Sequence, residues 1–284
     1  MAETIPAQPN ASIPMIRIEH SRGWVSLRLR DLWEYRELLY FLVWRDVKVR
    51  YKQTVMGLAW VIIQPLLTMM IFTVIFSRFA KIPSDGLPYP VFVYTALLPW
   101  TYFASAMGRC GNSLLGDAQL IEKVYFPRLI IPVSSIVSPL VDFLFSFLVL
   151  LGMLFWYGFT PTWGVLALPL FLFLAVLTTL SVGLWLAPLN VRYRDVVHVI
   201  PFLLQIWMYL SPVIYPVSAV PERWRLLYSL NPMVGVIEGF RWALLGKENT
   251  VLSVVSVSAL AVMVLLWSGL IFFKRMERTF ADVV

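Results

Sequence analysis

Six long stretches with almost no charged residues constrain what this chain can fold into. The hydrocarbon core of a bilayer is about 30 Å thick, and a helix needs roughly 20 residues to cross it. Every stretch is long enough, and Asp142 is the sole acidic or basic residue within them. They predict an all-α integral membrane protein with six transmembrane helices, because a β-barrel would show alternating segments of about ten residues. The stretches cover 57–77, 88–108, 129–157, 163–191, 199–221 and 250–273.

The composition excludes the ordinary alternatives to a membrane protein. Of the 284 residues, 60% are hydrophobic and 14% are charged, whereas soluble domains are about one quarter charged. This excludes a soluble enzyme and a disordered chain. Proline is frequent within the apolar stretches, where neighbouring helices of a bundle can satisfy the freed carbonyls, so we expect kinked or broken helices. Among these prolines are Pro65, Pro99, Pro132, Pro139, Pro169, Pro188, Pro201 and Pro212.

Lysine and arginine are unevenly distributed between the predicted spans. With both termini in the cytoplasm, 17 of the 23 basic residues lie on the cytoplasmic side and 6 on the other. The positive-inside rule therefore favours cytoplasmic termini. The net charge of +7 is then a topology signal, and we expect no nucleic-acid partner. Residues 1–30 lack the apolar core of a signal peptide, so we expect a loose tail over 1–33 and one transmembrane domain over 34–284.

The residues directly before the first span repeat with helical spacing. We predict an amphipathic interface helix over 34–52 that lies along the cytoplasmic membrane surface. Asp46 and Arg50 interrupt its apolar side, so a lipid anchor and a docking role against protein both stay open. Its apolar side consists of Tyr35, Leu39, Val43, Val47 and Tyr51, and its basic side of Arg45, Lys48 and Lys52.

Two connections between spans have unusual compositions. The cytoplasmic loop 109–128 places charges beside an apolar cluster, which indicates a contact surface, although Tyr125 and Phe126 fit an aromatic belt at the lipid headgroups equally well. The external connection 222–249 contains an apolar piece over 226–237 that Asn231 and Pro232 interrupt. This piece is too short to span, so we predict a re-entrant or interfacial helical hairpin before the sixth span.

The sequence lacks the motifs of catalysis and metal binding. It has no glycine-rich loop followed by Lys-Ser or Lys-Thr, so we do not expect the chain to hydrolyse ATP by itself. Its histidines, His20 and His198, have no cysteine or carboxylate at ligand spacing, so we expect no metal site. No Ser/His/Asp or paired-carboxylate arrangement is evident, and we do not expect an enzyme. Asp142 is either an ion relay or a structural hydrogen-bonding group, and we favour the structural role.

Aromatic residues make up 15% of the chain. Many lie near predicted helix ends, where tryptophan and tyrosine form belts at the headgroup level. Flat aromatic faces with a polar edge also suit a surface over which sugar rings slide. The sequence leaves both roles open. The candidates for such a sugar path are Trp100, Tyr102, Tyr209, Tyr215, Trp224 and Trp242.

Several short motifs follow one another in a specific order. They are WRDVKVRYK at 44–52, GLAW at 57–60, QP at 64–65, LPW at 98–100, KVYFPR at 123–128, NVRYRDV at 190–196, SPVIY at 211–215 and NPM at 231–233. In this order they resemble polysaccharide-export permeases of the type-2 ABC transporter class. The resemblance covers about 38–273, nearly the whole chain. Several motifs in the right order are far more specific than any single one.

This resemblance implies a permease subunit in the bacterial inner membrane that exports a lipid-linked polysaccharide of the O-antigen, teichoic acid or capsule type. It implies a homodimer with two copies of a separate ABC ATP-binding subunit, which would hold ATP and Mg while this chain holds no cofactor. By position, 117–128 and 192–197 would be the coupling elements, and the interface helix would contact the ATPase. The residues so implied in coupling are Asp117, Glu122, Lys123, Tyr125, Arg128, Arg192, Arg194 and Asp195.

A glycan on a polyprenyl pyrophosphate requires basic groups at the cytoplasmic side of its path. Candidates by charge and predicted depth are Arg50, Lys52, Arg192 and Arg194, and attraction to ordinary lipid headgroups is the competing role. Two other classes stay open. An ion-coupled secondary transporter or channel would use Asp142 as its relay and predicts inverted repeats, which the sequence does not show. A membrane-embedded glycosyltransferase would require clustered acidic residues at one face.

Overall fold

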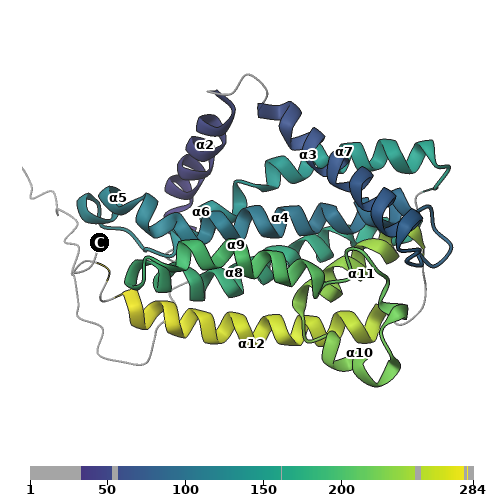
Figure 1. Ribbon diagram of the computed structural model, residues 1–284. Helices are drawn as coiled ribbons and strands as arrows, with labels where there is room; N and C mark the ends of the chain where they lie inside the picture. Colours follow the sequence, from purple (N-terminus) through teal and green to yellow (C-terminus); the bar gives the residue numbers. More distant parts are fainter. Residues whose placement is uncertain (1–32, 53–56, 161, 247–250, 278–279, 281–284) are drawn as a thin grey trace, which may run out of the picture.

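The helices of the computed structural model lie side by side in an elongated bundle (Figure 1). The structure describes residues 33–52, 57–160, 162–246, 251–277 and 280, and every regular element in these ranges is helical. The longer helices are α2 (Arg36–Lys52), α3 (Gly57–Phe72), α4 (Tyr89–Gly116), α7 (Leu140–Trp156), α8 (Leu168–Arg192), α9 (Val196–Tyr209), α11 (Pro232–Leu245) and α12 (Val251–Glu277). The shorter elements are α5 (Ala118–Lys123), α6 (Ile130–Val137), α10 (Glu222–Tyr228), the π-helix η1 (Thr73–Phe79) and the 3-10 helices η2 (Trp163–Ala167) and η3 (Val217–Ala219).

Four segments of the described residues are long and apolar enough to cross a membrane, which makes the chain a multi-pass membrane protein. They match the first, third, fourth and sixth predicted spans. The second predicted span corresponds to α4, which has 28 residues and continues beyond that span to Gly116, but tyrosines, prolines and small residues lower its hydropathy. The four segments are Ala59–Phe79, Ile130–Trp156, Trp163–Arg192 and Leu252–Glu277.

Helix α9 covers only the first part of the fifth predicted span, 199–221. Helix α9 ends at Tyr209 after 14 residues, and the chain then turns over 210–216 without forming a helix. The physical reason is Pro212, which lacks the backbone N–H that a longer helix needs and disfavours helical geometry at the residue before it. The count of six spans therefore stays a prediction.

Helix α4 is the central element of the bundle. It packs against α3, α6, α7, α8, α9 and α11. Three of its buried tyrosines donate hydrogen bonds to backbone carbonyls of other segments: Tyr89 to Ile214 at 2.9 Å, Tyr94 to Ser146 at 3.3 Å and Tyr102 to Ile136 at 3.2 Å. A buried hydroxyl without a partner would destabilise the fold, so these bonds explain how polar aromatic residues fill the core.

The third predicted span is two helices with a break between them. Helix α6 ends at Val137 and α7 begins at Leu140, with Pro139 at the junction. The break agrees with the expectation that proline interrupts some spans. Asp142 lies in the first turn of α7, near the middle of the apolar segment Ile130–Trp156. A carboxylate is favoured there by the helix dipole.

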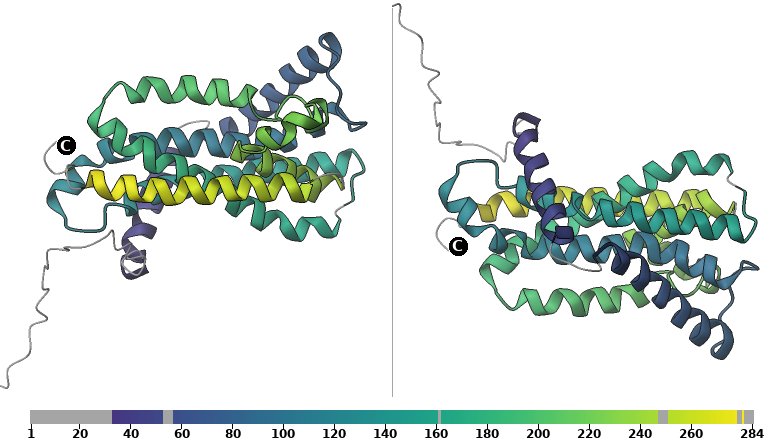
Figure 2. Two further views of the ribbon diagram at one scale, coloured as in Figure 1. Left: turned by 90° about the horizontal axis from the view of Figure 1, so that it is seen from below. Right: turned by 90° about the horizontal axis from the view of Figure 1, so that it is seen from above.

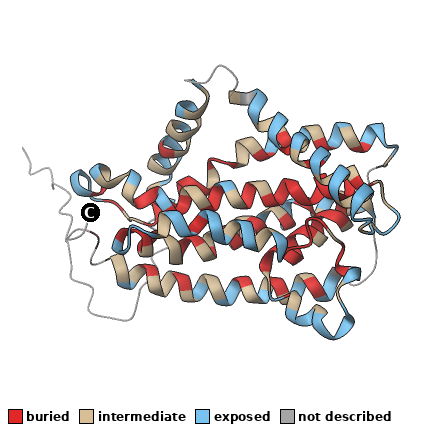
Figure 3. Cartoon of the chain, viewed as in Figure 1, coloured by how far each residue is buried: buried red, intermediate tan, exposed pale blue. Residues whose placement is uncertain are grey.

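Two helices depart from the bundle direction. Helix α2 runs across it, and α3 leans outward from the other helices (Figure 2). Only 11% of the apolar window in Ala59–Phe79 is buried within this chain, whereas α4 and α11 are largely buried (Figure 3). The first span therefore leaves most of its apolar surface to lipid or to another chain.

The two ends of the bundle are different. One end carries α5 together with the C-terminal ends of α8 and α12, and we name it the α5 end (Figure 1). The opposite end carries α10 and the turn before α4, and we name it the α10 end. Residues 1–32 of the predicted tail lie outside the described residues.

The segment before α12 forms a helical hairpin of α10 and α11, as the interruption at Asn231 and Pro232 predicts. The Asn231 side chain caps α11 by accepting from the Met233 backbone N–H at 3.1 Å. Helix α11 continues to Leu245, beyond the predicted apolar piece, and packs against α4, α8 and α12. Whether this hairpin enters a membrane stays a prediction.

Candidate functional site

The first contact between α2 and the bundle is an ion-pair cluster around Arg45. Its guanidinium lies 2.8 Å from the Asp117 carboxylate and 2.9 Å from the Asp46 carboxylate. The hydrogen bond to Asp117, followed by that to Asp46, raises the pKa of Arg45 against the opposing effect of burial. Because Asp117 is the residue between α4 and α5, this cluster ties α2 to the start of α5.

The second contact joins the C-terminal turn of α2 to α7. The Asp142 carboxylate forms an ion pair with Arg50 and accepts a hydrogen bond from the Tyr51 hydroxyl. Burial and the neighbouring Arg109 guanidinium lower the pKa of Arg50 to about 10, so Arg50 stays protonated at neutral pH. These contacts give Asp142 a structural partner, which agrees with the role that the sequence favours.

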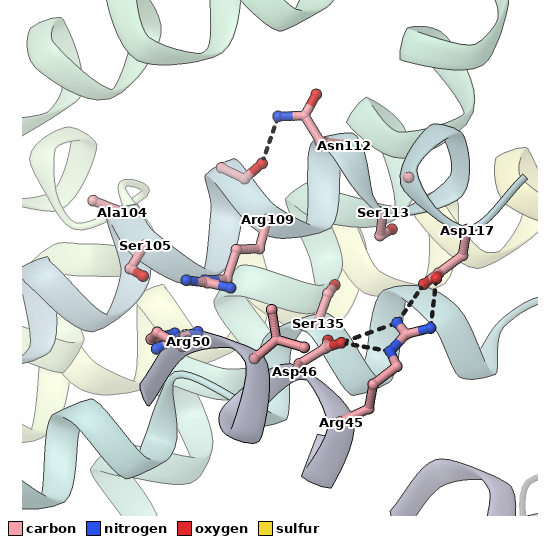
Figure 4. A pocket seen from close by; sticks show the side chains of 13 residues that line it. Arg45, Asp46, Arg50, Ala104, Ser105, Arg109, Asn112, Ser113, Asp117 and Ser135 are labelled. Atoms are coloured by element: carbon pink, nitrogen blue, oxygen red, sulfur yellow. Dashed lines mark hydrogen bonds and ion pairs between the residues drawn. The ribbon is translucent and has the colours of Figure 1, made fainter. Parts of the chain in front are cut away.

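A pocket of about 780 Å³ opens between α2 and the C-terminal half of α4 (Figure 4). It is open to the surface and not an enclosed cavity. Three arginines line it, and its other lining residues are mostly small or polar. The lining consists of Arg45, Asp46, Val49, Arg50, Ala104, Ser105, Gly108, Arg109, Asn112, Ser113, Gly116, Asp117 and Ser135.

Arg109 differs from the other two arginines of this pocket. Arg45 and Arg50 have carboxylate partners, but Arg109 forms no hydrogen bond or ion pair with any residue in the described part of the chain. Its guanidinium lies close to that of Arg50 (Figure 4). The sequence did not single out Arg109, because the predicted span ended at Gly108. The available signal was that Arg109 follows Ser105 by four residues, a spacing that puts both side chains on one face of a helix.

The predicted pyrophosphate contacts are only partly brought together. Arg50 lines the pocket, whereas Lys52, Arg192 and Arg194 do not. Lys52 is exposed at the end of α2, and Lys48 is exposed one turn earlier. Arg192 is exposed and stacks over the Tyr193 ring, 5.4 Å from its centroid. Of the four predicted basic groups, only Arg50 lines this pocket, and its other two arginines are Arg45 and Arg109.

The first predicted coupling segment forms an exposed tip at the α5 end. Glu122 and Lys123 are exposed at the end of α5, and the Tyr125 side chain is 83% exposed. Phe126 is buried beneath them and anchors the segment in the apolar core. Arg128 donates to the Glu277 carbonyl of α12, and its guanidinium lies 5.8 Å from the Phe280 ring centroid.

The second predicted coupling segment is the turn between α8 and α9. Arg192, Arg194 and Asp195 are all exposed there, and Asp195 is the residue that precedes α9. This turn lies at the α5 end, the same end as the α5 tip (Figure 1). Both predicted coupling segments therefore share one end of the molecule.

Helix α2 is less simply amphipathic than its sequence pattern predicts. The predicted apolar side is half-buried against the bundle, with Leu42 buried beside it. Aromatic residues also cover the outward side, where Tyr40, Phe41 and Trp44 are exposed. The physical reason is that Trp44 and Phe41 follow Leu38 at helical spacing, which gives the helix a second apolar face.

The predicted sugar-path aromatics have different surroundings. Trp100 and Tyr102 are 4% and 3% exposed and pack in the core around α4, which corrects the expectation that they line a path. The other four keep an accessible surface: Tyr209 and Trp224 are exposed, and Tyr215 and Trp242 are half-buried.

A buried arginine at the α10 end was not predicted from the sequence. Arg241 of α11 is 3% exposed, pairs with Glu238 at 2.8 Å and lies 3.6 Å from the Phe92 ring centroid. Its pairing on one helix, at i and i+3, was visible in the sequence, but its burial was not. Among the described residues, no group of three His, Cys, Asp or Glu side chains is placed to hold a metal ion.

Comparison with known proteins identifies the family. Residues 37–245 match the family model described as ABC-2 type transporter. The O-antigen export system permease protein RfbA of Myxococcus xanthus is 31% identical over 90% of this chain and 98% of its own. The protein of the same name from Klebsiella pneumoniae is 30% identical over 87% and 95%, and the polysialic acid transport protein KpsM of Escherichia coli is 23% identical over 82% and 91%. The resemblance expected from the motifs is confirmed, and the chain belongs to the ABC-2 type transporter family.

Proposed function

We propose that this chain is the permease subunit of an ATP-driven exporter that carries a lipid-linked polysaccharide across the bacterial inner membrane. One observation carries the proposal: the chain is 31% identical to an O-antigen export system permease over 90% of this chain and 98% of the relative. Similarity over nearly the full length of both chains supports a shared task rather than one shared segment. The relative named for polysialic acid transport supports a polysaccharide as the substrate class.

Two copies of the chain would form the membrane path. Within one chain, α3 is mostly unburied and α9 buries only Ile200 among its residues. Exposed apolar faces on both helices fit contact with lipid and with a second copy. Side chains of α4 fill the core of a single bundle, so a path for a polymer is better placed between two copies.

Helices α4 and α9 are the two further spans of the proposed six-helix subunit. At about 1.5 Å per residue, α4 would be roughly 42 Å long and sufficient to cross the bilayer. Helix α9 is shorter, and the α10–α11 hairpin beside it would enter the membrane from the outer side. Burial of α11 against α4, α8 and α12 supports a re-entrant position, since an apolar helix of this kind requires cover from water.

The α5 end would face the cytoplasm and receive two ATP-binding subunits. The full sequence carries no phosphate-binding loop, so ATP and Mg would bind to the partner chains. The two exposed segments at this end, the α5 tip and the α8–α9 turn, are suited to contact with such partners. Membership of an ABC transporter family implies this division of labour between permease and ATPase.

Helix α2 would lie at the cytoplasmic membrane surface. It crosses the direction of the spans (Figure 2), so it is parallel to the membrane plane if the spans are perpendicular to it. Its exposed Tyr40, Phe41 and Trp44 would sit at the headgroup level, where such aromatic residues are favoured. With the α5 end in the cytoplasm, the C-terminal end of α12 would lie on the same side of the membrane as α2, which agrees with the distribution of basic residues.

The path for sugars would use the aromatic residues that keep an exposed surface. Tyr209 is the last residue of α9 and Trp224 lies on α10, so both are toward the α10 end and suit the outer part of such a path. A secondary transporter that relays ions through Asp142 is not favoured, because this carboxylate already binds Arg50 and Tyr51. The contacts of Asp142 explain its presence without a relay.

Reconstitution tests the proposed function. The chain is purified gently from its own membrane together with its ATP-binding subunit and placed in liposomes, and ATP hydrolysis is measured with and without lipid-linked O-antigen, capsule or teichoic acid glycans. We expect one class of lipid-linked glycan to stimulate hydrolysis and to be exported. The proposal fails if the chain never retains an ATP-binding subunit and export proceeds without one.

A further inference from the structure

The pocket between α2 and α4 has an uneven division of charge. Both of its lining carboxylates, Asp46 and Asp117, bind Arg45 at one side. At the other side, Arg50 pairs with the Asp142 carboxylate, whereas Arg109 has no carboxylate within ion-pair distance among the described residues. Two neighbouring guanidiniums of like charge repel each other, and a bound anion removes that repulsion.

The wall of the pocket provided by α4 leaves space in front of these arginines. Gly108 precedes Arg109, and a side chain added at Gly108 would meet no other atom within 4 Å. Ser105 lies one turn before Arg109, is exposed, and forms no hydrogen bond with a residue in the described ranges. Figure 4 shows Ser105, Arg109 and Arg50 around the same space. The pocket therefore combines an open volume with three groups that donate hydrogen bonds.

The position of the pocket points to the ligand. Its wall on the other side is α2, the helix that crosses the bundle and exposes Tyr40, Phe41 and Trp44. Aromatic residues of this kind sit at the level of lipid headgroups. A lipid whose headgroup carries phosphate would then reach the pocket at its own depth in the membrane, with its acyl or prenyl chains in the hydrocarbon layer.

We propose that the α2–α4 pocket binds the phosphate of a lipid headgroup, with the Arg50 and Arg109 guanidiniums and the Ser105 hydroxyl as donors. Planar guanidiniums bind phosphate oxygens in pairs, which favours phosphate over a spherical anion. A volume of about 780 Å³ accommodates a headgroup larger than one phosphate. The source of the phosphate is either a polyprenyl diphosphate carrier or a membrane phospholipid.

This inference rests on the proposed function in one respect, that the chain is embedded in a membrane and handles lipid-linked cargo. It goes further by assigning a site and by replacing Lys52 and Arg192 with Arg109 as the partner of Arg50. A carrier bound there would hold its charged group between the interface helix and the central helix, beside the cluster that ties α2 to α5.

The test measures lipid binding to the purified permease in complex with its ATP-binding subunit. Undecaprenyl diphosphate and phosphatidylglycerol are titrated separately in detergent, with phosphatidylcholine as the reference for non-specific attachment, and bound lipid is counted by native mass spectrometry. Two variants remove different properties of the site: Arg109→Gln removes one guanidinium, and Gly108→Leu fills the space in front of it.

Each variant has a matched control. Arg36→Gln removes the same charge from an exposed position on α2 outside the pocket. Gly152→Leu adds the same side chain to α7, where an added carbon also meets nothing within 4 Å. Thermal unfolding of all four variants is measured alongside, and we expect Gly108→Leu to keep the stability of the wild type because its new side chain enters open space.

We expect Arg109→Gln and Gly108→Leu each to weaken binding about tenfold or more, and both controls to stay within about twofold of the wild type. If both pocket variants lose affinity for undecaprenyl diphosphate alone, the site binds the lipid carrier. If they lose affinity for both probes, the site binds phosphate-bearing lipids in general. Wild-type affinity of both pocket variants overturns the proposal. So does weakening by Arg109→Gln alone, because the attraction would then not depend on the pocket.

The measurements distinguish failure of the lipid-phosphate site from failure of the proposed function. If the pocket variants bind both probes normally while the complex still hydrolyses ATP in response to a lipid-linked glycan, the site is wrong and the exporter stands. If the chain binds lipid phosphate as expected but needs no ATPase for transport, the site stands and the exporter is wrong.

Discussion

Asn231 joins α9 to α11 through both atoms of its side-chain amide. Its oxygen accepts from the Trp207 indole N–H at 2.8 Å and from the Met233 backbone N–H at 3.1 Å. Its nitrogen donates to the Leu210 carbonyl at 2.9 Å and to the Ser211 hydroxyl at 3.0 Å. An amide offers an acceptor and two donors on one short side chain, which explains why asparagine occupies this position.

Two substitutions of Asn231 separate the contribution of its side-chain oxygen from that of its side-chain nitrogen. Asn231→Ala removes the cap of α11 and leaves the Trp207 N–H without its acceptor, so we expect a loss of about 2 kcal/mol in stability. Asn231→Asp keeps the acceptor and loses the two donated bonds, so we expect about half that loss. Thermal unfolding of the purified protein in detergent measures both. Equal losses in the two variants would contradict the assigned role of the side-chain oxygen.

The pairing of Asp142 with Arg50 and Tyr51 gives a second prediction for single residues. The two charged side chains are 15% and 21% exposed, so loss of the carboxylate leaves a poorly solvated guanidinium. We expect Asp142→Leu to reduce stability by about 2 kcal/mol and Asp142→Asn to reduce it less, since the amide oxygen still accepts hydrogen bonds. Thermal unfolding measures the difference.

Export by the Asp142→Asn variant distinguishes a structural group from a relay. An amide cannot take up and release a proton at neutral pH, but it can maintain the contact between α7 and α2. We therefore expect Asp142→Asn to export its glycan at close to the wild-type rate in cells. Normal insertion and stability with export abolished would make the carboxylate part of the transport mechanism.

At the scale of helices, the sequence predicted the location of spans, which depends on composition. It did not predict which prolines break a helix, which depends on contacts with neighbouring helices. Apolar stretches located the spans because crossing a membrane is set by length and hydropathy. The effect of proline was not local: Pro139 separates two helices, whereas Pro99 and Pro188 lie inside α4 and α8. Whether a proline breaks a helix depends on groups from other helices that satisfy the freed carbonyl.

The candidate site illustrates the same limit. Arg50 was predicted from its charge and position on the interface helix. Arg109 was missed because α4 continues as a helix to Gly116, eight residues beyond the predicted end of the second span. Arg109 lies opposite Arg50 because α2 crosses α4, and no local pattern in the sequence predicts the crossing angle of these two helices. A tertiary contact of this kind requires the structure.

Close packing of α11 on α12 gives a prediction for these two elements. Gly235 lies in the first turn of α11, where its backbone N–H has no partner within the helix and donates to the buried Ser258 hydroxyl at 3.1 Å. A carbon added at Gly235 would lie 2.5 Å from the Ser258 side chain. We expect Gly235→Ala to reduce stability by about 1 to 3 kcal/mol, measured by thermal unfolding.

The matched control is Gly152→Ala in α7. Gly152 is in a helix interior with nothing within 4 Å of an added carbon, so alanine there should leave stability unchanged or raise it by about 0.5 to 1 kcal/mol. If Gly235→Ala also leaves stability unchanged, α11 and α12 are not held at the distance that the structure gives.

At the scale of the whole molecule, the two ends have different physical properties. At the α10 end, the hairpin is held by buried polar contacts such as the hydrogen bond that the Ser258 hydroxyl of α12 donates to the Ser229 carbonyl at 2.8 Å. At the α5 end, Glu122, Lys123 and Tyr125 project on a short helix and a turn, while Phe126 anchors the segment beneath them. Charges on an anchored and exposed tip contribute little to stability, so their replacement affects a partner more than the fold.

Charge reversal at this tip tests its role in the assembly. In the double variant Glu122→Lys, Lys123→Glu, we expect normal folding and insertion, because both side chains are exposed. We expect ATP hydrolysis by the complex to continue while export falls at least about tenfold, since complementary charges set the register of a docking surface and reversal makes them repulsive. Hydrolysis and export are measured on the same reconstituted vesicles.

The control reverses another adjacent exposed pair at the α10 end, Glu222→Arg with Arg223→Glu, and should keep hydrolysis and export linked. Normal export by the Glu122 and Lys123 variant would remove the α5 tip from the coupling mechanism, whereas loss of both hydrolysis and export would assign the tip to assembly of the complex.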